Sequence, residues 1–272
     1  MSAQQIFDRL WNAYTRQNPE ALGIYNLFVN EGEVVVNDHI AFRTFNHPGI
    51  NIDVIAKPFL AAGYQYKDSY RFEDKHLFAR HYEHPTLPDA PRVFISELIA
   101  GDFSMELQST IQSITDKIPS DLLESDELLF SGNIWGTPSY ETYEKLRAES
   151  EYAAWVYVYG FRANHFTVSI NSLKKHNTIE KVNKLLKDNG FRLNDAGGEI
   201  KGTPAELLEQ SSTRAGILPV TFTEGVFEIP TCYYEFARRY PDSSGQLYSG
   251  FIAKSADKIF ESTDFYKKKD TF

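Results

Sequence analysis

The sequence predicts an α+β protein in which two βαβββ modules form a curved, barrel-like mixed sheet, with added helices. The segments DHIAFRTF at 38–45 and NHFTVSIN at 164–171 are both rich in β-branched and aromatic residues, as strands are. A helical apolar pattern follows each segment and stops at a glycine, 24 residues after the histidine in the first copy and 25 in the second. Extended segments follow both glycines. This repeated order indicates two copies of one structural unit.

The chain begins with two predicted helices within residues 1–30. Ser2 and Gln5 have the spacing of a capping box, and apolar residues then recur at helical spacing until an Asn-Pro pair interrupts them. The first module is predicted at 35–100. It contains the strand at 38–45, a helix at 50–62 and extended segments around 64–72, 77–82 and 92–98.

Residues 110–155 separate the two modules. They contain an acidic loop, a turn-rich stretch and a helical pattern, so we predict a helical insertion that packs as an added layer outside the cleft. The second module is predicted at 160–240, with extended segments at 207–212, 218–222 and 231–237. A C-terminal segment, 241–272, ends in a lysine-rich stretch predicted to be solvated. We expect residues 1–272 to form one domain.

Composition excludes several classes of protein. The chain has 28 basic and 37 acidic residues and a net charge of −9, which disfavours binding to nucleic acids or anionic membranes. A single cysteine, Cys232, excludes an intrachain disulfide and is predicted to be a buried thiol. The N-terminus has no signal-peptide pattern, and no apolar run approaches the roughly 20 residues of a bilayer span. We therefore predict a cytoplasmic protein without nucleic-acid or membrane partners.

Two histidines and one glutamate are the candidate metal ligands. His39 and His165 occupy equivalent positions on the first strands of the two modules, and Glu235 lies on the last strand of the second. If the modules pair, the three side chains meet at one point. Two neutral imidazoles and a carboxylate leave coordination positions open, as in non-heme Fe(II) oxygenases, but zinc uses the same ligand types. Ligand chemistry alone leaves both metals open.

Simpler interpretations exist for each of these residues. A lone histidine on an apolar strand is more often a packed, hydrogen-bonded side chain than a ligand. A buried carboxylate such as Glu235 needs a partner, and an ion pair with Arg238 or Arg239 would supply one. Glu97 is the first module's counterpart of Glu235 and a candidate fourth ligand. The matched positions in two repeats favour the metal site.

Other motifs carry less information. His76, His81 and His84 lie among charged residues and are predicted at the surface rather than at a metal. The sequence has no nucleophile elbow, Walker-type loop or dinucleotide-binding glycine fingerprint. The predicted chemistry therefore depends on the two histidines and the glutamate.

At these residues the sequence resembles the 2-oxoadipate dioxygenase/decarboxylase family, a former domain of unknown function within the vicinal-oxygen-chelate (glyoxalase) superfamily. The matching pieces keep their order over nearly the whole chain, which makes the resemblance stronger than any single motif. They are DHIAFR at 38–43, NHFT at 164–167, LLEQSS at 207–212, YYEFARR at 233–239 and SADKIFES at 255–262.

The resemblance implies an Fe(II) site formed by His39, His165 and Glu235, with Arg43 as an anchor for a substrate carboxylate. It also implies oxidative decarboxylation of 2-oxoadipate with O₂ to 2-hydroxyglutarate and CO₂, a reaction of lysine catabolism. An arginine fork suits a carboxylate, although a surface or inter-strand salt bridge is the alternative for Arg43. The chain is shorter than the bacterial members and has YSG at 248–250 where they resemble Tyr-Glu-Asp.

Three functions from different classes stay open at the level of sequence. The first is the iron dioxygenase/decarboxylase, acting on a small 2-oxo acid and O₂. The second is a metal-dependent lyase, isomerase or hydrolase of glyoxalase type, because one scaffold hosts several reactions. The third is a metal-free protein that binds a small molecule, which the retention of all three candidate ligands disfavours.

Overall fold

The computed structural model describes residues 1–253, and the chain divides into two compact units. The SADKIFES segment at 255–262 and the lysine-rich end lie outside the described residues. Within 1–253, no helix is both long and apolar enough to cross a membrane. The first unit comprises Met1–Tyr14, Ala41–Asn164 and Ile217–Ile229, and the second comprises Thr15–Ile40, His165–Gly216 and the chain from Pro230 onward.

The first unit contains the first βαβββ order. Strand β3 pairs in antiparallel register with both β2 and β4, and β4 neighbours β1, whose last five residues belong to this unit. Strand β3 buries alternate residues from Leu77 to His81, whereas β4 is buried at every position from Val93 to Leu98, as expected for a strand covered on both faces. The elements are β1 (Asn37–Phe45), α3 (Ile52–Ala61), β2 (Gln65–Phe72), β3 (Leu77–Glu83) and β4 (Arg92–Leu98).

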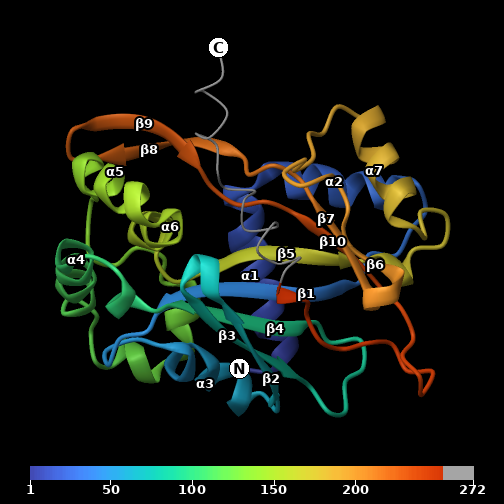
Figure 1. Ribbon diagram of the computed structural model, residues 1–272, viewed down its shortest axis with the longest axis horizontal. Coiled ribbons are helices and arrows are strands. Elements are labelled where there is room, and N and C mark those ends of the chain that lie inside the picture. The colour runs from blue at the N-terminus through green and yellow to red at the C-terminus, as the bar shows by residue number, and fades with distance from the viewer. Residues whose placement is uncertain (254–272) are drawn as a thin grey trace. The chain divides into compact units, whose positions relative to one another are not determined.

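Helices and a hairpin complete the first unit. Helix α6 is buried along its whole length from Tyr152 to Tyr159, so part of the insertion belongs to the core rather than to an outer layer as predicted. A two-stranded sheet lies beside α5 (Figure 1), where the rings of Phe227 and Tyr140 stack with centroids 3.7 Å apart. The elements are α1 (Ala3–Gln17), α4 (Met105–Thr115), α5 (Tyr140–Glu149), α6 (Glu151–Tyr159), β8 (Ile217–Phe222) and β9 (Gly225–Pro230).

The second unit contains the second copy, and its strands form a mixed sheet. Strand β10 is parallel to β5 on one side and antiparallel to β7 on the other, and β7 pairs with β6. The N-terminal part of β1 neighbours β5. The α+β class is confirmed. The elements are α2 (Pro19–Asn30), β5 (Ala163–Ser169), α7 (Ile179–Asp188), β6 (Lys201–Thr203), β7 (Leu208–Ser212) and β10 (Glu235–Arg239).

Both repeat helices end in the same way. Gly63 and Gly190 adopt positive φ angles of 100° and 83°, a backbone conformation that residues other than glycine rarely adopt. The next amide donates to the carbonyl five residues back in each copy, Tyr64 to Phe59 at 3.0 Å and Phe191 to Leu186 at 3.0 Å. This is the Schellman arrangement. The glycine that marked the repeat in the sequence is therefore a structural requirement in both copies.

The strand assignment of the second copy needs a correction. The predicted segment at 218–222 is β8, which pairs with β9 in a separate sheet, while the missing strand is the short β6. The last strand begins at Glu235 rather than at 231. Apolar alternation indicates that a segment such as β8 is a strand, but it does not indicate which sheet the strand joins. The strand β6 has three residues, one of them glycine, and so gives almost no periodic signal.

A buried carboxylate fixes the loop that follows β5. Glu33 is 5% exposed and accepts hydrogen bonds from the backbone amides of Lys174 (2.6 Å), Lys175 (2.7 Å) and His176 (3.0 Å). Burial alone would raise the pKa of Glu33, but the three amides and the His176 ring outweigh it and lower the pKa to about 2. The ionised form therefore stabilises the folded state.

Glu33→Gln is expected to lower the free energy of unfolding by up to about 3 kcal/mol at pH 7, because the ionised acceptor is lost. The folded pKa lies below the ordinary value, so this stabilisation is complete above about pH 4.5 and is lost as the pH falls toward 2. Urea denaturation at several pH values measures the difference between variant and wild type. Glu31→Gln, at an exposed neighbour, is the control and should change stability little. A Glu33→Gln deficit that persists unchanged at pH 2 would contradict this account.

Candidate metal centre

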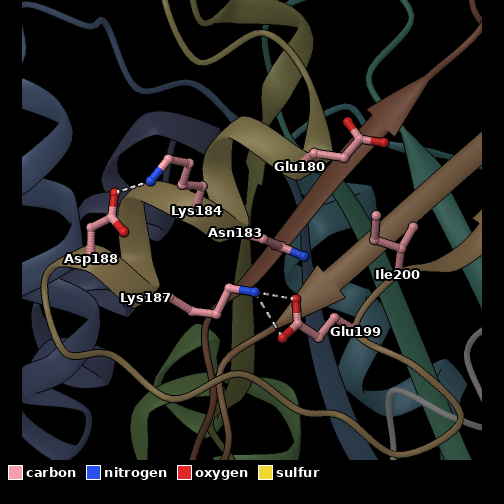
Figure 2. A pocket seen from close by; sticks show the side chains of 7 residues that line it. All are labelled: Glu180, Asn183, Lys184, Lys187, Asp188, Glu199 and Ile200. Carbon is pink, nitrogen blue, oxygen red and sulfur yellow. Dashed lines mark hydrogen bonds and ion pairs between the residues drawn. The ribbon is translucent and has the colours of Figure 1, made fainter.

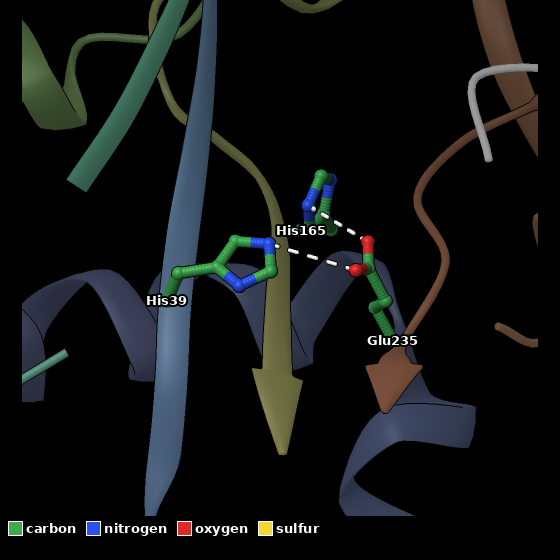
Figure 3. A group of neighbouring side chains, drawn as sticks. All are labelled: His39, His165 and Glu235. Carbon is green, nitrogen blue, oxygen red and sulfur yellow. Dashed lines mark ion pairs between the residues drawn. The ribbon is translucent and has the colours of Figure 1, made fainter. Parts of the chain in front are cut away.

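Three strands of the second unit each contribute one side chain to a buried cluster (Figure 3). His39 lies on β1, His165 on β5 and Glu235 at the first position of β10. Because β10 pairs in parallel with β5, Glu235 lies opposite Thr167, two residues after His165 and on the same face of the sheet. The three residues are 3%, 4% and 1% exposed. The structure thus brings together the three residues that the sequence predicted as ligands.

The distances within the cluster suit a shared ion. The Nε2 atom of His39 lies 3.6 Å from Oε1 of Glu235, and Nε2 of His165 lies 3.2 Å from Oε2 of the same carboxyl group. All three candidate ligand atoms lie within 4.8 Å of one another. Two ligands that bind one ion at right angles with bonds of about 2.1 Å lie roughly 3 Å apart. The donor set and its spacing therefore fit one divalent metal with open coordination positions.

Glu235 is held in an environment that opposes its ionisation. Its burial raises its pKa to about 8, against the opposing effects of a hydrogen bond from Gln210 and of the charges on Arg239 and Lys201. The Nε2 atom of Gln210 donates to Oε1 of Glu235 at 2.5 Å. Without a bound cation, the carboxyl group of Glu235 is therefore largely protonated at neutral pH. A cation at the cluster would favour the carboxylate form.

Two aromatic side chains fix the orientation of the imidazole rings. The ring of Tyr233 stacks on His165 with centroids 4.7 Å apart and an interplanar angle of 27°. The ring of Phe251 meets His39 edge-on at 4.8 Å. Both aromatic residues are buried. They leave each imidazole little rotational freedom, and they exclude water from the cluster. No local spacing in the sequence indicates either contact.

Asp38 and Arg239 form a buried ion pair next to the cluster. The Nε and Nη2 atoms of Arg239 donate to the two carboxylate oxygens of Asp38 at 2.7 and 2.9 Å. Asp38 Oδ1 also lies 2.8 Å from Nδ1 of His39. Arg239 was the predicted ion-pair partner of Glu235 in the simpler interpretation, but its bidentate pair is with Asp38. The guanidinium of the other candidate, Arg238, lies 5.0 Å above the ring of Tyr240.

Arg43 belongs to the first unit, and its side chain is 3% exposed. Its guanidinium carbon lies 5.0 Å from the ring centre of Tyr152 and 5.2 Å from that of Trp155, both on α6. The Tyr152 hydroxyl donates to the carbonyl of Ser96 at 2.7 Å and accepts from the amide of Thr44 at 3.0 Å. Arg43 is therefore a buried cation beside two aromatic faces and does not lie at the surface.

The fourth-ligand alternative that the sequence left open for Glu97 is not supported, and the predicted surface position of His81 is wrong. Glu97 is not part of the cluster, since its carboxylate accepts from the amide of Ile52 at 3.0 Å and from Nδ2 of Asn46 at 2.5 Å. It caps the N-terminus of α3 instead of binding a metal. His81 is 1% exposed rather than at the surface, and its Nδ1 lies 2.9 Å from the hydroxyl of Tyr70. Neighbouring charges in the sequence hid this burial, because a strand exposes only alternate residues.

A surface depression of about 470 Å³ lies elsewhere on the second unit, between α7 and the residues that precede β6 (Figure 2). Its lysines are paired, Lys184 with Asp188 at 2.7 Å and Lys187 with Glu199 at 2.9 Å. None of the three cluster residues, His39, His165 and Glu235, lines it. Exposed, mutually neutralised charges of this kind are typical of a solvated surface, and we assign no chemistry to the depression.

The fold and the cluster define a class: an α+β protein that gathers two histidines and a glutamate into a buried centre suited to a divalent metal. Residues 8–242 match the family model described as 2-oxoadipate dioxygenase/decarboxylase. The chain belongs to this family. It is 35% identical, over 96% of its length and 77% of the relative's, to the protein named "2-oxoadipate dioxygenase/decarboxylase, chloroplastic" of Arabidopsis thaliana.

Two solved structures are similar over almost the whole chain. One is the hydroxyglutarate synthase from Oryza sativa in complex with 2-oxoadipate, with a TM-score of 0.89 and 35% identity over 95% of this chain and 91% of that one. The other comes from Shewanella frigidimarina NCIMB 400, with a TM-score of 0.88 and 49% identity over 93% of this chain and 98% of that one. The resemblance to the family found in the sequence is thus confirmed.

Proposed function

We propose that this protein is an Fe(II)-dependent dioxygenase that decarboxylates a 2-oxo dicarboxylic acid, converting 2-oxoadipate and O₂ to 2-hydroxyglutarate and CO₂. The observation that carries the proposal is the buried His39, His165 and Glu235 cluster in a chain of this family. The reaction balances, because both oxygen atoms of O₂ enter the products and no other oxidant is needed. Zinc has the same ligand preferences, so the proposal of iron depends on the redox character of the reaction.

Different side chains would hold the metal and the substrate. Nε2 of His39, Nε2 of His165 and the carboxylate of Glu235 would hold the ion. A bound divalent iron supplies a Lewis acid for the keto and carboxylate oxygens of a 2-oxo acid and the electrons for activating O₂. Three protein ligands would leave other coordination positions of the ion for substrate and O₂. Closely packed rings at both histidines keep water away from that side.

Arg43 is the proposed anchor for a substrate carboxylate. Its guanidinium is permanently charged and buried, and aromatic rings lie over it. A planar fork of this kind pairs with a carboxylate through two parallel hydrogen bonds. A dicarboxylic substrate offers one carboxylate for the metal and another for an arginine. This division explains why a 2-oxo dicarboxylate, rather than a simple 2-oxo acid, would be the preferred substrate.

The test is O₂ uptake by anaerobically purified, iron-loaded protein with a panel of 2-oxo acids. We expect O₂ consumption with 2-oxoadipate, release of CO₂ in equal amount, and much weaker turnover of 2-oxo acids that have a single carboxylate. The zinc-loaded protein is the control and should consume no O₂. Turnover of these compounds without O₂ would indicate a glyoxalase-type lyase, isomerase or hydrolase instead, and binding without turnover would indicate a small-molecule binding protein.

The cellular setting stays a prediction. We propose a cytoplasmic location and a role in lysine catabolism; the Arabidopsis relative is named chloroplastic. Fractionation of cells that express the chain with an epitope tag would test the location. Accumulation of 2-oxoadipate after deletion of the gene would test the metabolic role.

A further inference from the structure

The buried carboxylate of Asp38 contacts the candidate ligand His39 and also Arg239, which in turn contacts residues of the segment 240–253. Asp38 is 4% exposed and contacts Nδ1 of His39 with one oxygen, while both its oxygens accept from Arg239. Arg239 is 2% exposed, and its Nη1 donates to the carbonyl oxygens of Tyr248 at 2.9 Å and Gly250 at 2.7 Å. The guanidinium therefore links the carboxylate of Asp38 to the backbone of the segment.

The same segment places a ring against the candidate ligand. The Phe251 ring meets His39 edge-on at 4.8 Å, and the guanidinium carbon of Arg239 lies 5.2 Å above that ring. Phe251 is 6% exposed. The Thr167 hydroxyl lies 3.1 Å from Nε2 of His39. Two further contacts fix the imidazole, a hydrogen bond at Nδ1 and an aromatic ring beside its plane. Arg239 contacts the groups responsible for both.

We propose that Asp38 and Arg239 are positioning residues of the metal centre. Asp38 holds the proton of His39 on Nδ1, so that Nε2 presents its lone pair toward Glu235 and the ion. Arg239 fixes the direction of that carboxylate and ties residues 248–250 in place, which seats Phe251 on the imidazole. The inference rests on the proposed function to the extent that His39 is a metal ligand.

Energetics favour this role over simple stabilisation. Burying an aspartate and an arginine costs desolvation that their attraction often fails to repay, so an apolar pair of similar volume would be at least as stable. Asp38 accepts twice from Arg239 and lies within hydrogen-bond distance of His39 Nδ1, so three of the roughly four acceptor sites of its carboxylate point at these two residues. An ionised carboxylate can only accept and so holds an imidazole in one tautomer, whereas a side-chain amide can satisfy either tautomer.

Asp38→Asn is the first test, with metal affinity as the readout. The amide has the same shape but can donate to Nδ1, which would move the histidine proton to Nε2 and block ligation. Calorimetric titration of the metal-free protein with Co²⁺ should show a Kd weaker by about 10- to 100-fold. The absorption bands of the Co²⁺-loaded protein should also change, since the ligand field changes. Unaltered affinity and bands in a folded Asp38→Asn variant would overturn the proposal.

The chain offers a closely matched control. Asp102 Oδ2 lies 3.0 Å from Nδ1 of His76 at an exposed site of the first unit, so Asp102→Asn makes the same chemical change outside the cluster. Its Co²⁺ affinity and spectrum should match those of wild type. If wild type itself binds no Co²⁺, the proposed metal centre fails. If wild type and Asp38→Asn bind Co²⁺ equally, only the positioning role fails.

Arg239→Lys keeps the proposal testable if Asp38→Asn does not fold. Lysine preserves the charge but reaches fewer of the four acceptor groups, so the segment should loosen while the core stays folded. We expect faster amide hydrogen exchange in residues 248–251 and a Co²⁺ Kd weakened at least about threefold. Faster exchange with unchanged affinity would show that the guanidinium holds the segment only, and would overturn the positioning role of Arg239.

Discussion

His165→Ala is expected to remove the bound metal and abolish O₂ consumption with every substrate, whereas Arg43→Ala is expected to retain the metal and lose only substrate anchoring. Removing a charge-assisted hydrogen bond costs about 1.5 to 3 kcal/mol, so kcat/KM of Arg43→Ala for 2-oxoadipate should fall roughly ten- to more than a hundredfold. Iron content measured alongside steady-state O₂ uptake separates the two variants. The reason is that one residue belongs to the buried cluster and the other lies between the rings of α6.

Arg43→Lys is the matched control for charge. It keeps a cation between the same rings but removes the planar fork, so its kcat/KM should lie between wild type and Arg43→Ala. Equal loss of iron in Arg43→Ala and His165→Ala would show that Arg43 supports the metal site instead. Unchanged turnover in Arg43→Ala would show that the substrate carboxylate is bound elsewhere.

Glu235→Gln is expected to abolish metal binding and activity while making the metal-free protein more stable at neutral pH. Burial raises the pKa of Glu235 to about 8 in the folded state, so the folded protein binds more protons than the unfolded chain between about pH 4.5 and 8. The wild type therefore loses stability as the pH rises through this window. Glutamine carries no charge at any pH, and the variant should be more stable by about 3 kcal/mol at pH 7.

Urea denaturation in the presence of a chelator measures this difference. The two proteins should have nearly equal free energies of unfolding at pH 4.5 and diverge as the pH rises. Glu31→Gln, at an exposed glutamate of the same unit, should show no such divergence. A wild type whose stability does not change between pH 5 and 8 would contradict the raised pKa. A buried carboxylate that must bind a cation is expected to lower the stability of the metal-free protein in this way.

The contacts of Arg239 with residues 248–250, which read YSG, are made by the backbone. Arg239 contacts the carbonyl oxygens of Tyr248 and Gly250, not their side chains. The contact therefore survives changes in side-chain identity, provided that the backbone keeps its path.

The repeat and the triad were predictable because both depend on local patterns. Composition rich in β-branched and aromatic residues identifies β1 and β5, and helical apolar spacing with the glycine stops identifies α3 and α7. Equivalent positions in the two copies single out the two histidines. Glu235 followed from its place on the last strand. These signals involve residues a few positions apart, which the backbone geometry of a strand or helix fixes without reference to the rest of the chain.

Only the tertiary structure decided which distant residues are in contact and what electrostatic environment each of them has. Asp38 and Arg239 are 201 residues apart, and no local spacing indicates that they form a pair. The burial of His81 and Arg43, the separate β8–β9 sheet and the raised pKa of Glu235 likewise depend on what packs against each group. The sequence by itself determined the ligand types and the repeated frame that carries them. Packing decided their protonation and orientation, because desolvation and hydrogen bonding arise only after distant segments exclude water together.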